Sequence, residues 1–541
     1  MPVRVAVIGG GVVGLMALKN FREDGFDATL YEGRAWVGGL WKYSDDEWLS
    51  TAENTKFNSS KFRTAIPDFP FSKHVDDFPT ASQLYEYLNA YCQHFDLWPH
   101  VKLSSRVTSV KRSGERWALE VTPNDAPSYT AHYDKVAFAC GSFTSPRQPT
   151  LDGIDQFKGR ALHAVNFHNP SQFEGQNVLV VGAHASAQDV VAQLSEHASH
   201  VYLSHRSGVL LLSRYSSDGS VYDRMPPLNF TIFTLYLQTW FPNLFTWMMD
   251  SLIGMMAKKS FPTQPASLGS LLTTKAPSIA VAAPLIASEL YPHFESGFCE
   301  GVPGIRKISG PRSIELTSDR TLDNVDAIVY CTGYHMTIPV EMESSLNPYA
   351  YPGSSANLYR QIFPLHPDPD IRNSLAFLGQ AAVPLPGFAQ HEMVSMCISQ
   401  VWRGKSRLPP LAEMQRWHRN IQAWRADQTK RYQAQSTFYP VFVPMADHLA
   451  WMDSCAGLGM RRHFGLLSRW TNWEAWKFWW NDRELYNLCL TGLSSPAIFR
   501  LFDEGKRKAW AGARKQILLD NESVKLQQQE RQKQLQAKKE I

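Results

Sequence analysis

The sequence has few cysteines, and they form no pattern that carries chemistry. The seven are odd in number and widely scattered, and none stand in C-x-x-C spacing. This distribution excludes the short-spaced ligand pairs of a zinc site and the paired thiols of a redox motif. It predicts reduced thiols in an intracellular compartment, and we expect no bound metal. The cysteines are Cys92, Cys140, Cys299, Cys331, Cys397, Cys455 and Cys489.

A strong excess of one charge and a targeting segment are also lacking. A formal net charge of +4 over 541 residues is too small to indicate a nucleic-acid partner. No basic stretch precedes the first apolar run, so we expect no signal peptide and a cytoplasmic protein. With 44% hydrophobic and 19% charged residues the chain is globular. Its length predicts two domains or one large domain with an insertion, and nothing in it indicates an oligomeric state.

A glycine motif follows a buried strand at the start of the chain. The apolar run Val3–Ile8 leads into Gly9-x-Gly11-x-x-Gly14, and Glu32 ends the next strand. Glycines at this spacing allow a tight turn, close approach of the backbone to a pyrophosphate, and close packing of helix on strand. Glu32 would accept hydrogen bonds from a ribose. Together these features predict a bound dinucleotide, whereas a turn without a ligand leaves Glu32 unexplained.

A second strand, turn and helix follow in the middle of the chain. The run NVLVV leads into Gly182, and Ala187 stands at the third glycine position, which tolerates alanine. The middle position is His184, where close approach of a phosphate favours glycine. Arg206 follows the next strand, where it would pair with an adenosine 2′-phosphate, and a solvated surface arginine is the alternative. Because Glu32 would repel such a phosphate, the first motif indicates FAD and the second NADPH.

These motifs predict an α/β protein with two nested, Rossmann-like, three-layer dinucleotide-binding domains and a helical insertion. We place the FAD domain in residues 1–160 and 325–541, with a helical, tryptophan-rich extension at its C-terminal end. The NADPH domain covers 165–324 and carries an apolar insertion at about 225–290. The apolar strand Ala327–Tyr334 is expected to close a dinucleotide domain.

The insertion is uncharged over much of its length. Residues 225–249 carry no formal charge and many aromatic side chains. The segment is near the length of a membrane span, but its polar residues and Pro242 disfavour one. We expect a helical insertion that either shapes a substrate tunnel or contacts a membrane surface peripherally through 228–257, and simple core packing fits equally well.

Five tryptophans cluster near the C-terminal end, and the spacing of the first three predicts one helical stripe. Packing between domains is the commoner meaning of such a stripe, ahead of a ligand or membrane surface. Helical periodicity also marks Ala81–Phe95, and the polar tail after Arg514 predicts a solvated helix. The clustered tryptophans are Trp470, Trp473, Trp476, Trp479 and Trp480.

Longer motifs extend over nearly the whole chain. Between the glycine motifs lies Phe157-x-Gly159-x-x-x-His163-x-x-x-Phe167. With it, GGLW, Asn-x-Ser-Lys followed by PDFPF, CTGY, and SSPAIFRL with AWAGAR occur in the order and at the intervals of one family. On these motifs the chain resembles the flavin-containing monooxygenases, which are class B flavoprotein monooxygenases. The motifs stand at Gly38–Trp41, Asn58–Lys61, Pro67–Phe71, Cys331–Tyr334 and Ser494–Arg514.

The resemblance implies FAD in the first domain, hydride transfer from NADPH, and addition of dioxygen to the reduced flavin to form a 4a-hydroperoxide. A soft nucleophile, an amine nitrogen or a sulfur, attacks the outer oxygen of that group. The cofactor thus carries the chemistry, while the protein positions it and excludes water. Together with the apolar insertion, this implies a fairly large, apolar small-molecule substrate. The tryptophan content and the polar tail are similar to fungal members that make secondary metabolites.

The resemblance also implies roles by position. Asn58 matches the family's active-site asparagine, a neutral donor near flavin and nicotinamide, and an Asx-turn residue is the alternative. His163 would brace the interdomain linker. The residues expected to bind FAD are Gly9, Gly11, Gly14, Glu32, Gly39, Leu40, Trp41 and, through its backbone at the adenine, Val107. Those expected to bind NADPH are Gly182, His184, Ser186, Ala187 and Arg206, and Thr332 and Gly333 are further cofactor-binding residues.

Two departures from the family leave alternatives open. His184 and Ala185 replace glycine and asparagine, so the imidazole either displaces the pyrophosphate or, if protonated, pairs with it. One alternative is therefore a flavin-binding protein with impaired NADPH turnover. Phe167 and His168 stand where Baeyer–Villiger oxygenases have tryptophan followed by proline or aspartate, which favours heteroatom oxygenation over ketone oxygenation, the other alternative. Electron transfer to a disulfide would need a cysteine pair beside the flavin, and none stands at short spacing.

Overall fold

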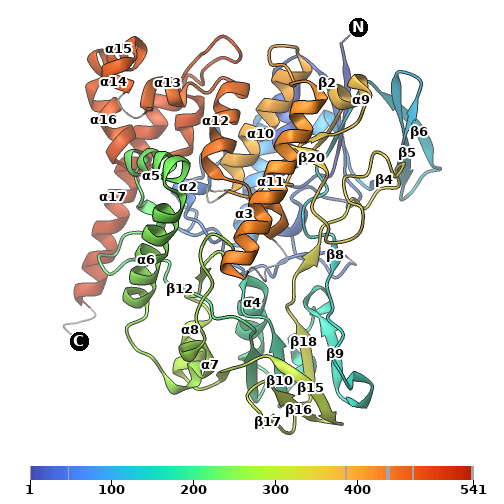
Figure 1. The fold of residues 1–541 in the computed structure, drawn as a ribbon, viewed down its shortest axis with the longest axis vertical. Helices are drawn as coiled ribbons and strands as arrows, with labels where there is room; N and C mark the ends of the chain where they lie inside the picture. Colours follow the sequence, from blue (N-terminus) through green and yellow to red (C-terminus); the bar gives the residue numbers. More distant parts are fainter. Residues whose placement is uncertain (1, 47, 384–386, 434–438, 466–467, 538–541) are drawn as a thin grey trace.

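Two parallel sheets of five strands each organise the chain (Figure 1). The structure is a computed structural model and describes residues 2–46, 48–383, 387–433, 439–465 and 468–537. The first sheet has the order β22 (Leu375–Phe377), β7 (Lys135–Phe138), β1 (Arg4–Ile8), β2 (Asp27–Tyr31) and β3 (Val101–Lys102). The second has the order β14 (Cys299–Val302), β11 (His200–Ser204), β10 (Asn177–Val181), β18 (Ala327–Tyr330) and β9 (Arg160–His163). Their central strands are continuous apolar runs, because parallel sheets are covered on both faces.

Helices cover one face of the first sheet, and a small antiparallel sheet covers the other. The helices are α1 (Val12–Glu23), α3 (Ala81–His94) and α10 (Gly387–Trp402), and the antiparallel strands are β4 (Ser105–Ser113), β5 (Arg116–Pro123) and β6 (Tyr129–Tyr133). Val5 and Val7 of β1 face the helices. Ala6 and Ile8 face the antiparallel strands. The period of two along β1 thus builds a three-layer unit around one strand.

The second sheet repeats this design. On one face lie α4 (Ala185–Leu194) and α8 (Tyr291–Glu295), and on the other lie the antiparallel strands β15 (Ile305–Gly310), β16 (Ser313–Leu316) and β17 (Thr321–Leu322). Val178 and Val180 of β10 face the helices, whereas Leu179 faces the antiparallel strands. The predicted fold class, two nested Rossmann-like three-layer domains with a helical insertion, is confirmed.

One predicted domain boundary falls inside a sheet. Strand β18 pairs in parallel with β10 and β9, so it belongs to the second sheet, although a boundary at residue 325 assigns it to the first domain. An apolar strand pattern does not tell which of two sheets the strand joins. We therefore propose that the second domain comprises residues 160–330. The chain returns through β19 (Tyr334–His335), which pairs with β8 (Ser145–Pro146) in the outgoing linker.

Helices dominate the C-terminal part. They are α11 (Leu411–Tyr432), α12 (Met445–Ala456), α13 (Met460–Phe464), α14 (Ser468–Thr471), α15 (Trp473–Asn481), α16 (Arg483–Thr491) and α17 (Ala513–Ala537). The predicted helix in the polar tail corresponds to α17, of which four residues are buried. The remaining elements are the helices α2 (Lys61–Thr64), α7 (Ser270–Thr273) and α9 (Pro369–Ser374) and the strands β12 (Leu211–Leu212), β13 (Leu285–Ile286), β20 (Leu358–Tyr359) and β21 (Phe363–Pro364).

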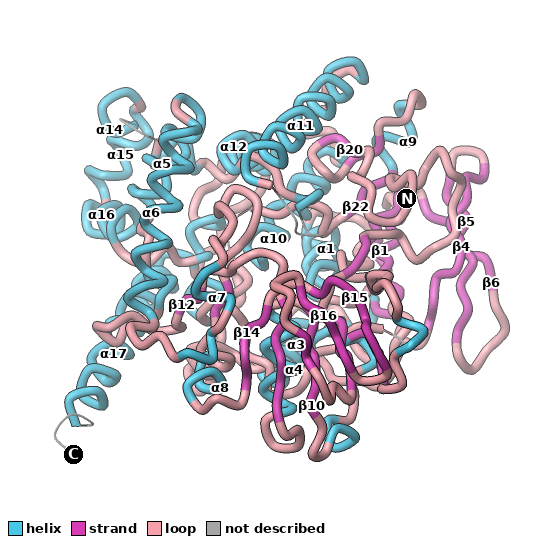
Figure 2. Tube along the Cα trace, turned by 60° about the horizontal axis from the view of Figure 1, so that its bottom comes forward, coloured by secondary structure: helices cyan, strands magenta, loops and turns pink. Residues whose placement is uncertain are grey.

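The insertion is helical, as expected, and joins these helices. It contains α5 (Leu228–Trp240) and α6 (Pro242–Ser260), and α5 contacts α12 and α16. Figures 1 and 2 both place α5 and α6 with α14 to α17 at one end of the molecule, away from the two five-stranded sheets. In these two fully described helices only Thr234 and Thr246 are buried, so simple core packing does not account for the apolar sequence. No helix in the described parts of the chain has the length and apolarity needed to cross a bilayer.

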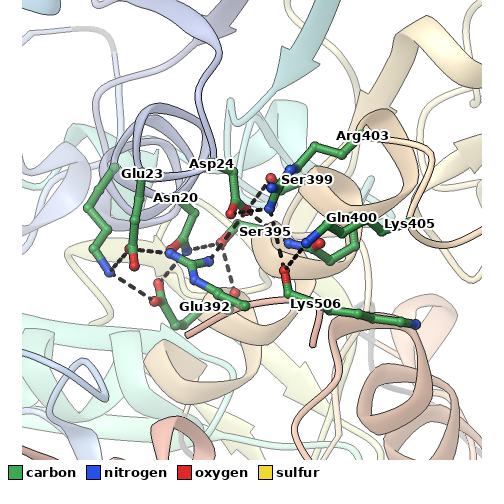
Figure 3. A network of polar contacts seen from close by, with 12 residues as sticks. Asn20, Glu23, Asp24, Glu392, Ser395, Ser399, Gln400, Arg403, Lys405 and Lys506 are labelled. Atoms are coloured by element: carbon green, nitrogen blue, oxygen red, sulfur yellow. Dashed lines mark hydrogen bonds and ion pairs between the residues drawn. The ribbon is translucent and has the colours of Figure 1, made fainter. Parts of the chain in front are cut away.

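A buried polar network ties α1 to α10 and to the C-terminal segment (Figure 3). Asn20 donates a hydrogen bond to Glu392 over 2.8 Å. Glu23 accepts from Arg500 over 3.0 Å and also pairs with Arg507. Burial raises the pKa of Glu23, but the surrounding cations, Arg507 first, lower it to about 2. The helix after the first glycine motif is thus fixed by residues from the far end of the chain.

Candidate cofactor-binding and active site

The first glycine motif forms the turn between β1 and α1. Gly9 has φ +112°, and a Cβ on it would lie 2.5 Å from the carbonyl oxygen of Ala139. A Cβ on Gly14 would lie 1.9 Å from the carbonyl oxygen of Gly9, so only glycine lets the helix approach the strand this closely. Gly11 is the N-cap of α1, with no side-chain cap. The turn leads into the amide end of α1, a positive helix end that fits the phosphates of a dinucleotide.

Glu32 lies beside this turn at the end of β2. Its carboxylate accepts the N–H groups of Gly10 over 2.5 Å and of Arg34 over 2.8 Å. Burial raises the pKa of Glu32, and these amides oppose the shift. Gly39 packs on the same turn, since a Cβ on it would lie 3.1 Å from the Cα of Gly11. The structure therefore brings Glu32 and the GGLW turn together around the first glycine motif.

Val107 lies near this group through its strand. β4 begins at Ser105, whose N–H donates to the carbonyl oxygen of Glu32 over 2.8 Å. The Val107 side chain is buried in the core between β4 and the first sheet. Only its backbone is therefore available for the adenine contact predicted for it.

An aromatic wall leads from the GGLW turn towards α10. Leu40 and Trp41 are half-buried in the short 3₁₀ helix Gly39–Trp41. The ring centroids of Trp41 and Phe57 lie 5.1 Å apart, and those of Phe57 and Phe388 lie 5.4 Å apart. Phe388 stands at the start of α10. The residue after Phe57 is Asn58, so the wall adjoins the predicted active-site asparagine.

The second glycine motif copies the first turn. Gly182 has φ +114°, and a Cβ on it would lie 2.4 Å from the carbonyl oxygen of Cys331. Ala187 is buried at the third position. Nε2 of His184 lies 3.2 Å from the carbonyl oxygen of Ala283. His184 is exposed by its surface area, yet the surrounding protein buries the ring enough to lower its pKa. A neutral ring that donates to Ala283 is held to one side of the helix end.

Ser186 and Arg206 are exposed at the carboxyl edge of the second sheet. Ser186 lies in the first turn of α4, and Arg206 follows β11. Within the described ranges the Arg206 guanidinium has no hydrogen-bond or ion-pair partner. The backbone of Gly304 lies near it, because a Cβ there would be 3.5 Å from Cγ of Arg206. An unpaired guanidinium at this edge fits the 2′-phosphate of NADPH.

Thr332 and Gly333 lie in the crossing between the two sheets. The N–H of Arg147 donates to the Gly333 carbonyl over 2.9 Å, and the Thr332 hydroxyl donates to the Arg147 carbonyl. Nε2 of His163 lies 3.1 Å from the same Gly333 carbonyl, and Nδ1 of His163 accepts the N–H of Val165. Burial lowers the pKa of His163, so the ring is a neutral donor. His163 therefore sits against the linker that it was expected to brace.

The segment that carries Asn58 is held by the second domain and by the start of the insertion. Asn58 itself is exposed, and its carboxamide forms no hydrogen bond within the described part of the chain. That finding does not support the Asx-turn alternative. The segment's contacts are Thr55 Oγ1 to Asp189 (3.1 Å), Arg214 to the Phe57 carbonyl (2.8 Å), Tyr222 OH to the Asn58 carbonyl (2.6 Å), and Ser60 N–H to Asp223 (2.7 Å).

Sequence reasoning missed these holding residues. Arg214 is 3% exposed and is fixed by two hydrogen bonds to Glu289, of 2.9 and 2.7 Å. Burial raises the pKa of Asp189 to about 6. Neither residue belongs to a local motif, because each acts across the domain boundary. Only the position of Asp189, one turn inside the helix of the second motif, could have suggested a role.

The structure also brings together two cysteines that spacing did not pair. Sγ of Cys455 donates to the carbonyl oxygen of Cys397 over 3.7 Å. Both thiols are buried between α10 and α12. This contact between helices leaves no mark at short sequence spacing, the only kind of pairing that the sequence analysis considered.

Comparison with known proteins agrees with this geometry. The family described as flavin-binding monooxygenase-like matches residues 2–540. The chain belongs to that family. Monooxygenase aurF of the fungus Gibberella zeae is 32% identical over 96% of this chain and 97% of its own length. The N-oxide-forming dimethylaniline monooxygenase 2 of Pan troglodytes is 27% identical over 76% of this chain and 75% of its own.

A solved structure of OTEMO in complex with FAD and NADP has a similar fold. It is 17% identical, with a TM-score of 0.59, over 84% of this chain and 98% of its own. The chain is an NADPH-dependent flavin monooxygenase whose cofactors are FAD and NADPH and whose substrates are a small molecule and dioxygen. The two glycine turns fit those cofactors, since each leads into the amide end of a helix.

Proposed function

We propose that this flavin monooxygenase transfers one oxygen atom of dioxygen to a nucleophilic nitrogen or sulfur of a fairly large, apolar small molecule. The observation that carries the proposal is the position of Asn58. Its segment lies beside the aromatic wall of the first domain and is bonded by the second domain and the insertion. The bound flavin, once reduced by NADPH, supplies the oxygen-transfer chemistry.

The protein binds and orients the cofactors and the substrate, and it excludes water. Gly9, Gly11 and Gly14 hold the pyrophosphate of FAD, and Glu32 accepts from its ribose with the lone pairs that Gly10 and Arg34 leave free. Gly182, Ser186 and Arg206 bind NADPH at the second motif. The exposed, unbonded carboxamide of Asn58 is free to donate to cofactor or substrate. The aromatic wall displaces water, which strengthens that hydrogen bond.

The insertion begins at this site. Tyr222 and Asp223, which bond the Asn58 segment, stand just before α5. We propose that this apolar helix, which leads away from Asn58, contacts the apolar substrate. Trp240 and Trp247 of the insertion are 73% and 66% exposed. Their exposure supports peripheral contact of residues 228–257 with a membrane, made by a cytoplasmic protein.

Two observations favour a heteroatom over a ketone. Phe167 stands in the motif where Baeyer–Villiger oxygenases have tryptophan. A relative that covers three quarters of the chain is named for forming an N-oxide. The fungal relative with 32% identity supports a role in secondary metabolism.

The test is turnover in ¹⁸O₂ with three probes, followed by mass spectrometry. N,N-dimethylaniline and methyl phenyl sulfide should give an N-oxide and a sulfoxide that carry one labelled oxygen. Cyclohexanone should give no lactone. A lactone as the main product would replace the proposal with ketone oxygenation. Absence of flavin bleaching by millimolar NADPH without oxygen would instead show impaired NADPH turnover.

A variant tests the role of Asn58. In Asn58→Ala we expect flavin content to stay unchanged, because the residue is exposed and its carboxamide forms no hydrogen bond to the described residues. NADPH should still be oxidised, but hydrogen peroxide should replace the oxygenated product. Unchanged product per NADPH would remove Asn58 from the active site.

A further inference from the structure

Two buried thiols meet between helices α10 and α12. Sγ of Cys455 donates to the carbonyl oxygen of Cys397 over 3.7 Å, and Sγ of Cys397 donates to the carbonyl oxygen of Met452 over 3.7 Å. A hydrogen bond also joins the two thiols. Cys397 is fully buried, whereas 7% of the Cys455 surface is exposed. The two sulfurs are therefore neighbours, and Cys455 is the one nearer to solvent.

Cys455 differs from the other cysteines in its electrostatic surroundings. The hydrogen bond from Cys397 is the largest cause that lowers the pKa of the Cys455 thiol, and the ammonium of Lys506 lowers it further. Nζ of Lys506 donates to the Ser406 hydroxyl over 2.7 Å and to the Cys455 carbonyl over 3.3 Å. Burial raises the pKa of the other six cysteines, that of Cys92 to about 12. Because the thiolate is the reactive form, Cys455 is the cysteine best suited to act as a nucleophile.

We propose that Cys397 and Cys455 form a redox modification site, which hydrogen peroxide converts to a disulfide. Peroxide is the product expected when this enzyme oxidises NADPH without transferring oxygen to a substrate. Cys397 lies roughly 14 Å along α10 from Phe388, so the pair does not adjoin the aromatic wall of the active site. The site is therefore distinct from an electron transfer between flavin and disulfide, and it goes beyond the oxygenation activity.

The oxidation takes place in two balanced steps. In the first, the sulfur of Cys455 attacks one oxygen of hydrogen peroxide, the O–O bond breaks, and the leaving hydroxide takes the thiol proton and departs as water. In the second, the sulfur of Cys397 attacks the sulfenic acid sulfur of Cys455, the S–O bond breaks, and the released hydroxide takes the proton of Cys397 to give a second water. The two thiols lose two electrons in total, and the peroxide gains them. Lys506 favours the first step because its charge stabilises the thiolate.

The test is peroxide treatment of the FAD-loaded full chain, followed by alkylation of free thiols with iodoacetamide, digestion and mass spectrometry. We expect the peptides of Cys397 and Cys455 to be joined with the loss of two hydrogens, and dithiothreitol to separate them. The internal control is Cys92, a buried thiol of α3, and Cys455 should lose its free thiol at least about tenfold faster than Cys92. Because the peroxide is added, the result does not depend on the proposed oxygenation.

A variant tests the division of roles within the pair. In Cys397→Ser the second step has no thiol, so Cys455 should stop at the sulfenic acid, which dimedone traps. The matched control Cys92→Ser removes a buried thiol elsewhere and should form the same disulfide as the wild type.

A second variant tests the charge without touching the sulfurs. Lys506→Met removes the ammonium beside Cys455, so the disulfide should form a few-fold more slowly. Lys405→Met is the matched control, since Lys405 donates to the carbonyl oxygens of Gly505 and Lys506 over 3.2 and 3.1 Å instead of that of Cys455. Its rate of disulfide formation should equal that of the wild type.

Two results would overturn the proposal. Peroxide could leave Cys397 and Cys455 both open to alkylation, or Cys455 could be oxidised no faster than Cys92. Each result is read from the wild-type chain, so neither depends on the folding of a variant.

Discussion

The two glycine motifs share one turn geometry but differ in how they meet a ligand. In each, a glycine with φ near +113° approaches the carbonyl oxygen at the end of a neighbouring strand, Ala139 for Gly9 and Cys331 for Gly182. The first motif then keeps glycine at its second and third positions, whereas the second motif has His184 and Ala187 there.

The charged residue that follows the second strand also differs between the two units. Glu32 is buried and already bonded to two amides, whereas Arg206 is exposed and unpaired within the described ranges. Preorganised donors and acceptors favour tight, lasting binding, and an exposed charge favours attraction and release. From this comparison we propose that the first site holds a resident cofactor and that the second binds one that exchanges.

The largest effect should come from the tightest contact of the first motif. In Gly14→Ala the new Cβ would lie 1.9 Å from the Gly9 carbonyl oxygen, so α1 must move away from β1. We expect the purified protein to lose its bound FAD, read from the absorbance of the flavin. Ala187→Gly at the matching position of the second motif is the control and should keep its flavin. A yellow Gly14→Ala protein with normal occupancy would show that the first turn is not rigid.

The next largest effect should come from a change that weakens the contact between the two domains at the active site. Arg214→Met removes the hydrogen bond to the Phe57 carbonyl, one of the four contacts that hold the segment carrying Asn58. Small misplacements of reacting groups cost up to ~100-fold in rate, so we expect product per NADPH to fall ~10–100-fold while NADPH binding holds. The control is Arg224→Met, since Arg224 bonds Gln528 instead of that segment. An equal yield of product per NADPH in both variants would mean that the second domain does not position Asn58.

The sequence predicted what depends on local pattern. The helix expected over 81–95 is α3, and the apolar runs after residues 3 and 177 are β1 and β10, because burial on both faces leaves a clear signature. The glycine motifs and Glu32 could be placed together because strand, turn and helix are adjacent in the chain. The membership of β18 and the meeting of Cys397 with Cys455 depend on contacts between distant segments, and no periodicity reports those.

The residues of the candidate site likewise fall into those that a local motif predicts and those that only contacts between distant segments bring together. Asn58 could be named from its motif, but the residues that hold its segment, such as Arg214 and Asp189, come from another domain. The single helical stripe expected over Trp470, Trp473 and Trp476 is wrong for a related reason, since α14 ends at Thr471 and α15 begins at Trp473. A stripe of tryptophans reports that a face is apolar, but it does not report whether protein or another phase covers that face.

A smaller effect should follow from removing the charge of the second site. In Arg206→Ala we expect the preference for NADPH over NADH to fall ~10–100-fold, the range of one charge-assisted hydrogen-bonded contact. The measurement is kcat/KM for each cofactor. NADH values should stay unchanged, which serves as the internal control. Equal preference in both proteins would leave Arg206 outside the site.

A still smaller gain should come from the second position of that motif. His184→Gly removes the ring held by the Ala283 carbonyl and opens the amide end of α4. We expect NADPH to bind a few-fold more tightly, measured by titration of the oxidised enzyme with NADP⁺. Because burial lowers the pKa of His184, the ring is neutral near pH 7 and offers the phosphate no compensating charge. Weaker binding in the variant would show that the imidazole itself pairs with the pyrophosphate.

The smallest effect should be a pH dependence of the stability that comes from Asp189. This residue of the second domain contacts the segment that carries Asn58. Burial raises the pKa of Asp189 from 3.8 to about 6, so between these values the folded chain holds a proton that the unfolded chain releases. Asp189 therefore does not lower the free energy of unfolding at low pH, and it lowers that free energy increasingly as the pH rises to about 6. Asp189→Asn keeps an acceptor for Thr55 but no charge, and should raise Tm by a few degrees at about pH 8, with little change below about pH 4. An equal shift at both pH values would mean that Asp189 ionises freely and that the second unit holds its partner without burying a charge.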